Sequence, residues 1–100
     1  MTYFIQEKSN VALIAAKILQ AKQVAIVFGK TIYLHNTSQA AFLNNKQWLR
    51  HELKHIQQYQ RLGFVIFLIL YLIETIKHGY YNNKYEVEAR AAENDISIDV

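Results

Sequence analysis

The sequence contains no cysteine and no proline, and only three of its 100 residues are glycine. The lack of cysteine excludes disulfide bonds, cysteine-ligated zinc and thiol catalysis, and it suits a reducing compartment, so we expect a cytoplasmic protein. The lack of proline excludes proline-rich linkers. Hydrophobic residues make up 52% and charged residues 19% of the chain. These values predict one folded domain over residues 1–100.

The sequence also lacks a strong excess of one charge. Eleven basic and eight acidic residues are interspersed and give a formal net charge of +3. This balance is too mild to indicate nucleic-acid binding, and we expect no nucleic-acid partner. The first residues show no basic segment followed by an apolar stretch, so we expect no signal peptide.

One uncharged apolar run extends from Leu62 to Ile73. As a helix it would be roughly 18 Å long, whereas the hydrocarbon core of a bilayer is about 30 Å thick. We therefore expect no transmembrane span and predict a buried helix at the centre of the core. A weak contact with a membrane surface is the alternative.

Periodicity and capping residues predict an α+β fold. Apolar residues at helical spacing follow Ser9, a plausible N-cap, to about Lys22. Residues 23–36 read as an antiparallel hairpin that turns at Gly29-Lys30 and pairs Val27 with Ile32. Three helices should follow, over about 45–62 with Asn44 as the N-cap, over about 64–78 ended by Gly79, and from about Lys84. The alternating residues 95–100 suggest a terminal strand.

The long predicted helix contains the complete H-E-x-x-H pattern, with His51, Glu52 and His55 at its fixed positions. Residues four apart lie one helical turn above each other, so both imidazoles can face one cation. Glu52 lies beside the first histidine, where it can take a proton from a water that zinc has acidified to a pKa of about 7. The ordinary alternative is a solvated surface helix, and the neighbouring Gln57-Gln58-Tyr59-Gln60 is expected to be such a polar face.

A catalytic zinc ion usually has three protein ligands, so a third must come from elsewhere. Glu86, Glu88 and His78 are the candidates after residue 77, and helical phase does not choose between the two glutamates. Glu86 can instead complete a capping box with Asn83, and His78 can instead interact with a helix dipole.

The stretch from Trp48 to Gln58, followed by Tyr85 to Ala92, resembles the gluzincin zinc metallopeptidases. The short chain is similar to the minigluzincins, compact relatives of the CAAX-protease group. In these proteins a glutamate on a second helix is the third zinc ligand, and matching by position puts that ligand on Glu86. Arg90 stands where the family usually has an aspartate that orients a zinc-binding histidine, and Glu88 or Glu93 can replace it.

The resemblance implies zinc-dependent hydrolysis of a peptide or protein substrate, with Glu52 as general base and His51, His55 and Glu86 as ligands. It also implies an edge strand beside the zinc that pairs with the substrate, and residues 33–35 are the expected edge. Four side chains are expected to contact the substrate or the oxyanion: Tyr33, His35, His78 and Tyr81. Tyr80 and Tyr85 are the alternatives for the oxyanion donor. A strand histidine bonded to nearby backbone is the alternative for His35.

In the minigluzincins the C-terminal segment can occupy the cleft and keep the enzyme latent, and residues 95–100 are the candidate here; a frayed terminus is the alternative. Two other functions remain open from the sequence. One is a non-catalytic zinc-binding or protein-interaction module of this fold. The other is a small basic protein that binds nucleic acid or a membrane surface and carries the motif by coincidence.

Overall fold

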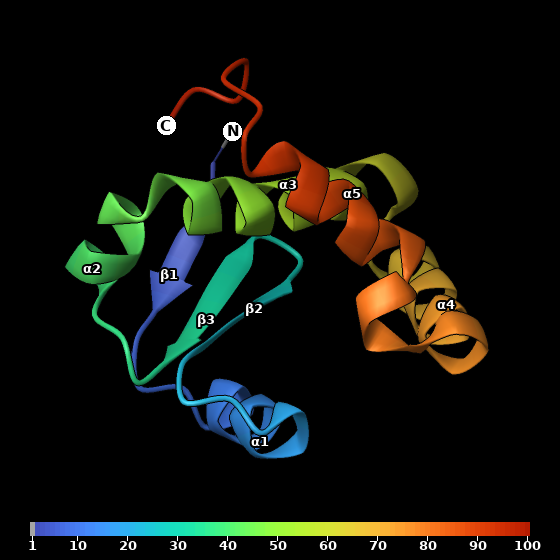
Figure 1. Cartoon of the computed structure of the whole chain (residues 1–100), viewed down its shortest axis with the longest axis horizontal. Coiled ribbons are helices and arrows are strands. Elements are labelled where there is room, and N and C mark those ends of the chain that lie inside the picture. Colours follow the sequence, from blue (N-terminus) through green and yellow to red (C-terminus); the bar gives the residue numbers. More distant parts are fainter. Residues whose placement is uncertain (1) are drawn as a thin grey trace.

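A computed structural model describes residues 2–100 and has an α+β fold (Figure 1). In chain order its elements are β1 (Phe4–Gln6), α1 (Asn10–Leu19), β2 (Val24–Phe28), β3 (Thr31–His35), α2 (Gln39–Asn44), α3 (Lys46–Leu62), α4 (Phe64–Asn82) and α5 (Lys84–Ala92). The predicted helices and hairpin are present in the predicted order, and the structure adds two short elements that the sequence did not predict, β1 and α2.

The sheet has the strand order β1-β3-β2. β2 and β3 form the predicted antiparallel hairpin, in which Val27 pairs with Ile32. β1 was not predicted; it pairs with β3 in parallel, so the small sheet is mixed rather than antiparallel throughout. A strand of three residues is too short to show the alternation of apolar and polar residues by which strands are recognised. Since β3 is central, the expectation that residues 33–35 form a free edge was also wrong.

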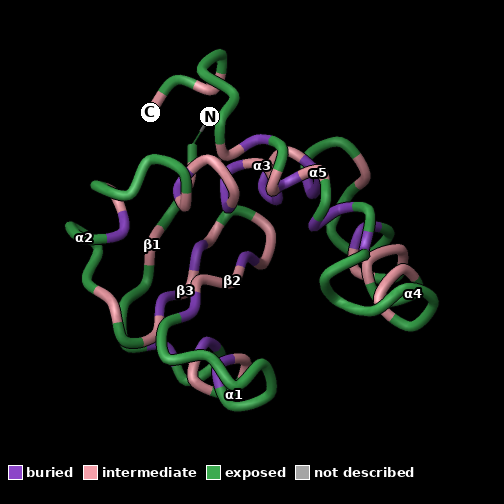
Figure 2. Tube along the Cα trace, in the orientation of Figure 1, coloured by how far each residue is buried: buried purple, intermediate pink, exposed green. Residues whose placement is uncertain are grey.

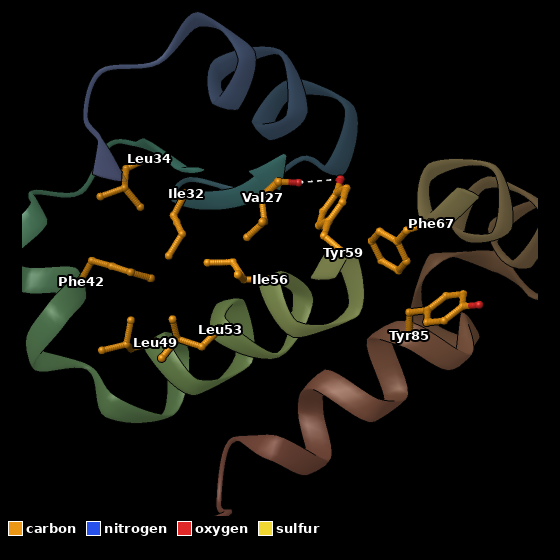
Figure 3. Packing of buried hydrophobic residues seen from close by; sticks show 10 residues of the cluster. All are labelled: Val27, Ile32, Leu34, Phe42, Leu49, Leu53, Ile56, Tyr59, Phe67 and Tyr85. Carbon is orange, nitrogen blue, oxygen red and sulfur yellow. Dashed lines mark hydrogen bonds between the residues drawn. The ribbon is translucent and has the colours of Figure 1, made fainter. Parts of the chain in front are cut away.

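The two faces of the sheet pack against different helices. Ile32 and Leu34 of β3 are fully buried in the cluster that also includes the apolar stripe of α3 (Figure 3). On the opposite face, Val24 packs with Ala12 and Ala16 of α1. This division follows from the two-residue period of a strand, which sends alternate side chains to opposite faces.

The predicted stripe of Leu49, Leu53 and Ile56 is buried and fixes the rotation of α3 on the sheet. Near the end of the helix, the hydroxyl of Tyr59 donates a hydrogen bond of 3.0 Å to the backbone oxygen of Val27 (Figure 3). The helix begins one residue later than predicted, because Asn45 rather than Asn44 accepts the capping bond from the Trp48 backbone N–H.

α4 is not the buried central helix that the sequence predicted. Phe67 is its one buried residue, and aliphatic side chains on its outer side are exposed (Figure 2). The helix contacts α3 and α5 along one side, and within residues 2–100 no element covers the other. Sequence periodicity could not reveal this exposure. A helix that is apolar on all sides is expected to be buried, but its sequence does not say whether protein or another apolar phase surrounds it.

By length and composition α4 is apolar enough to cross a membrane. Its helical geometry is nevertheless interrupted at Gly79, which has φ +81°. Glycine adopts this conformation without the steric penalty of a side chain, so it ends the regular helix as predicted.

Residues 95–100 do not form the expected strand. Ile98 and Val100 pack against the main core, and the guanidinium of Arg50 donates hydrogen bonds to the backbone oxygens of Ile98 and Glu93. The tail therefore lies against α3, where it lines a separate depression with Leu53 and Lys54. It contributes no residue to the two cavities that contain His51 and Glu52, so it does not occupy the cleft as a latent form would require.

Candidate metal centre

The site lies between α3 and α5, which pack side by side. Ala89 and Ala92 of α5 are buried at this contact, and their small side chains let the two backbones approach closely. Tyr85, on the same side of α5, packs edge-on against Phe67 at a centroid distance of 5.0 Å. This packing directs the carboxylate of Glu86 at the two histidines of α3.

His51, His55 and Glu86 form a group whose ligand atoms all lie within 4.8 Å of one another and which could hold a metal ion. Nε2 of His51 lies 3.1 Å from Glu86 Oε1, and Nε2 of His55 lies 3.2 Å from Glu86 Oε2. In a tetrahedral site with bonds of about 2.0–2.1 Å, ligand atoms are about 3.3 Å apart. The three side chains therefore fit a metal ion with only small adjustments.

The outer nitrogen of His51 is held by Glu93. Nδ1 of His51 lies 2.8 Å from Glu93 Oε2, and a carboxylate can only accept, so Nδ1 carries the proton. This bond leaves Nε2 free to bind a metal once it is deprotonated. Glu93 lies seven residues after Glu86, two helical turns further on, and supplies the contact expected from the position of Arg90.

The outer nitrogen of His55 is fixed in the same way by Gln58. The amide nitrogen of Gln58 donates to the backbone oxygen of Tyr85 and to a carboxylate oxygen of Glu88, each at 3.1 Å. Its oxygen must therefore accept from His55 Nδ1, at 2.8 Å, which again leaves Nε2 as the ligand atom. Gln58 is 1% and Tyr59 is 6% exposed, so the prediction of a solvated polar face was wrong at these two residues.

Tyr71, within α4, and Asn83, between α4 and α5, position the carboxylate of Glu86. The hydroxyl of Tyr71 donates to Glu86 Oε2 at 2.5 Å. Asn83 is fully buried, donates to the backbone oxygen of Tyr71 and to Thr75 Oγ1, and accepts the capping bond from the Tyr85 backbone N–H. The predicted N-cap at Asn83 is thus present, while the carboxylate of Glu86 lies with the histidines.

The cluster shifts the pKa values of its members. Burial alone would lower the pKa of His51, but the hydrogen bonds that it donates to Glu86 and Glu93 and the charge of Glu52 raise it to about 9. Burial likewise opposes protonation of His55, yet Glu86 and Glu52 raise its pKa. Burial would raise the pKa of Glu86, but its bonds with the two histidines lower it below its usual range. Without a metal ion, the centre is therefore an ion pair of imidazolium and carboxylate.

Glu52 does not join this ligand group. It is 5% exposed, and burial raises its pKa to about 7 although both histidines oppose the shift. Its side chain, with His51, lines a groove of about 610 Å³ that runs along Val24 and Ala25 of β2. A second, more apolar cavity of about 210 Å³ contains Glu52 and all three candidate ligands.

The remaining candidates from the sequence lie elsewhere. Glu88 contacts Gln58 and Arg61 rather than an imidazole. Tyr81 is 68% exposed and lies under the guanidinium of Arg90 at 3.9 Å. His35 lines a separate depression beside Ser9, and Tyr33 packs on the α1 side of the sheet. His78 lines neither cavity of the site.

The sequence did not assign Gln58 or Tyr71 to the site, and it left Tyr80 as one of several candidates for the oxyanion donor. Tyr71 and Tyr80 line the smaller cavity, and Tyr80 also lines the groove. A sequence signal existed for Tyr71, because it is the one hydroxyl in the run from Leu62 to Ile73 and a buried phenol needs a hydrogen-bond partner. The position of Tyr80 depends on the direction that the chain takes after the helix is interrupted at Gly79, and the sequence does not specify this direction.

No family model matches this chain, and no curated protein or solved structure shows significant similarity to it. The metal-binding capacity of the centre therefore stands on its geometry and on the hydrogen bonds that orient its ligands.

We predict that Glu86→Gln lowers affinity for a divalent transition-metal ion by about 100-fold or more, because one of three ligand atoms is lost. The matched variant Glu88→Gln should lower it by less than about tenfold, since Glu88 contacts no imidazole. Competition with a chromophoric chelator measures both affinities, and circular dichroism checks the fold. Equal losses in the two variants would contradict the assignment of Glu86.

Protons and the metal ion should compete for the histidine nitrogens. Because the pKa of His51 is about 9 in the metal-free protein, metal binding at pH 7 should release about one to two protons, and affinity should rise as pH increases towards 9. The free energy of unfolding of the metal-free protein should fall as pH rises over the same range. The contribution of His51 is present below its unfolded pKa of about 6.5 and is lost as pH rises through about 9.

Titration calorimetry in buffers of different ionisation enthalpy measures the proton release, and denaturant unfolding between pH 6 and 9 measures the stability. In His51→Gln the fall in metal-free stability across this window should become smaller. Metal binding without proton release at pH 7 would show that the imidazoles are already neutral.

Proposed function

We propose that this protein is a zinc-dependent peptidase of the gluzincin type. The single observation that carries the proposal is the buried carboxylate of Glu52, which lies beside a candidate His-His-Glu metal centre and faces an open groove. A pKa of about 7 suits a group that must first accept a proton and then return it at neutral pH.

The donor set favours zinc among the metals. Two neutral imidazoles and one carboxylate form the ligand set of many zinc peptidases, which keep a fourth position for water or substrate. A zinc ion bound there would supply an acidified water and polarise the carbonyl of the scissile bond. Glu93 and Gln58 would hold the two imidazoles as Nδ1–H tautomers, with Nε2 directed at the ion.

Glu52 would carry the proton transfers. Its ionised carboxylate accepts a proton from the attacking water, and the carboxylic acid so formed donates that proton to the nitrogen of the leaving amine. Burial favours the neutral acid in the second step, while the positive charge of a metal ion held in the centre would favour the carboxylate in the first. The opposing effects keep the two protonation states close in free energy.

The substrate would bind along β2 as an extended strand. β2 occupies one edge of the sheet, and within residues 2–100 no strand pairs with its outer side, so its backbone groups can pair with a peptide. Val24 and Ala25 bring this edge to the same groove as His51 and Glu52. The smaller cavity also contains Val27, Tyr59 and Leu68, which suits an apolar side chain next to the scissile bond.

Tyr80 is the proposed donor to the oxyanion that forms when the carbonyl becomes tetrahedral. It lines both cavities together with Glu52. Partial burial and the charges of Glu86 and Glu52 raise the pKa of its phenol, so the hydroxyl stays protonated and able to donate at neutral pH. This role replaces the one that sequence reasoning gave to Tyr81 and His78.

The Glu52→Gln variant should bind zinc like the wild type but lose at least about 1,000-fold in kcat on an unfolded protein substrate, because the amide cannot accept the proton. Glu7→Gln, a change at a distant carboxylate, should keep full activity. Zinc content and peptide release are measured on the same preparations. Wild-type protein that holds zinc and releases no peptide would overturn the peptidase proposal and leave a metal-bound interaction module.

A second pair of variants tests the oxyanion donor. Tyr80→Phe should lower kcat by about 100-fold with little change in KM, since the lost bond forms only in the transition state. Tyr81→Phe is the matched control and should match the wild type, because its ring is exposed and packs on Arg90. Similar effects of the two changes on kcat would remove Tyr80 from this role.

A further inference from the structure

The outward side of α4 is an unbroken aliphatic surface. Its exposed members recur at helical spacing and occupy about a third of the helix circumference. They are Val65, Ile66, Ile69, Leu72, Ile73 and Ile76, each between 42% and 76% exposed. No charged residue interrupts this set, which we call the outer face of α4. Soluble surfaces carry single exposed aliphatic residues, whereas a continuous set marks a surface that binds an apolar phase.

The contacts of α4 with the rest of the protein limit how the helix can be oriented relative to an apolar phase. Phe64 at its start stacks on Tyr59 at a centroid distance of 5.5 Å, and Tyr71 in its middle donates to Glu86. At its end, Asn83 ties it to α5. The regular helix before Gly79 is about 22 Å long. One side of it packs against α3 and α5. The helix therefore suits a position parallel to a bilayer surface rather than across it.

A second aliphatic surface lies on α1, on the opposite side of the β2–β3 hairpin from α3 (Figure 1). On α1, Val11, Ile14 and Ile18 are exposed and share one helix face, and Ile18 is 75% exposed. The same helix contributes Ala15 and Leu19 to the smaller cavity, to which α4 contributes Leu68 and Tyr71. Two exposed apolar helices thus flank the cavity of the candidate metal centre.

The charged residues near α1 and α4 indicate which kind of apolar surface these helices bind. Exposed basic residues lie on α1, after it, in the hairpin turn and at both ends of α4; they are Lys17, Lys22, Lys30, Arg61, Lys77 and Lys84. No acidic residue occurs between Lys8 and His51. A second copy packed antiparallel on α4 would bring Arg61 towards Lys77 of its partner, and a parallel copy would bring the two Lys77 together. Both arrangements are repulsive, whereas an anionic lipid surface attracts every one of these groups.

We propose that the outer face of α4, with the exposed face of α1, docks the protein on an anionic lipid bilayer. The six aliphatic side chains of α4 enter the boundary between headgroups and acyl chains, and the basic residues around them contact lipid phosphates. The cavity between the two helices then opens close to the bilayer. Docking of this kind goes beyond the proposed peptidase activity and does not depend on it.

Flotation of the full chain with lipid vesicles tests this docking. The protein should bind vesicles of phosphatidylcholine and phosphatidylglycerol, and should bind pure phosphatidylcholine at least about tenfold more weakly. Ile76→Gln should weaken binding to the anionic vesicles about fivefold, and Ile69→Gln combined with Ile76→Gln should weaken it tenfold or more. The matched control is Ile96→Gln, at an isolated residue of the C-terminal tail that is 87% exposed, and it should bind like the wild type.

The fold of each variant is checked by circular dichroism, and Glu52→Gln should bind vesicles fully, which separates docking from catalysis. Failure of the wild type to float with anionic vesicles would overturn the proposal, as would equal losses in Ile76→Gln and Ile96→Gln. Sedimentation of the lipid-free protein gives one more decisive outcome. A wild-type dimer that Ile76→Gln converts to a monomer, without vesicle binding, would assign the outer face to a second copy of the chain.

Discussion

The contact between one carboxylate and two imidazoles, made where α5 crosses α3, is the interaction on which the rest of the structure depends. Glu86 is 3% exposed, and a charged group at that depth is tolerated only when its oxygens are paired. Here His51, His55 and Tyr71 pair them. α3 and α4, which carry these partners, are thereby held against α5, and the packing of α5 is as much electrostatic as apolar.

This arrangement also explains why the site contains so many polar groups away from water. Each imidazole needs its outer nitrogen satisfied, and Glu93 and Gln58 supply the acceptors. Gln58 in turn requires acceptors for its amide group, which the backbone of Tyr85 and the side chain of Glu88 provide. Every member of the network thus constrains the next, and a site built in this way can hold its ligand atoms in one geometry before an ion arrives.

α4 connects α3 to α5, and its inner and outer sides lie in different surroundings. Its inner side must be apolar enough to cover Tyr59 and Tyr85, yet it must also present Tyr71 to a carboxylate. Its outer side packs against no element of the described residues 2–100 and is nevertheless aliphatic. In water that surface is costly, at about 25 cal/mol for each Å² exposed, which is the physical basis of the docking proposed for that side.

The sequence by itself determined the local elements and the metal-binding half of the motif. Ser9, Gly29, Gly63 and Gly79 mark helix and hairpin boundaries through backbone preferences that act within a few residues. The spacing of His51 and His55 places both rings on one helix side for the same local reason. Only the tertiary structure decided which distant groups meet them. The contacts of Glu93 with His51 and of Tyr71 with Glu86, the position of Tyr80, and the exposure of α4 depend on how helices cross. Helix crossing is set by the packing of many side chains at once, and no short segment of sequence encodes it.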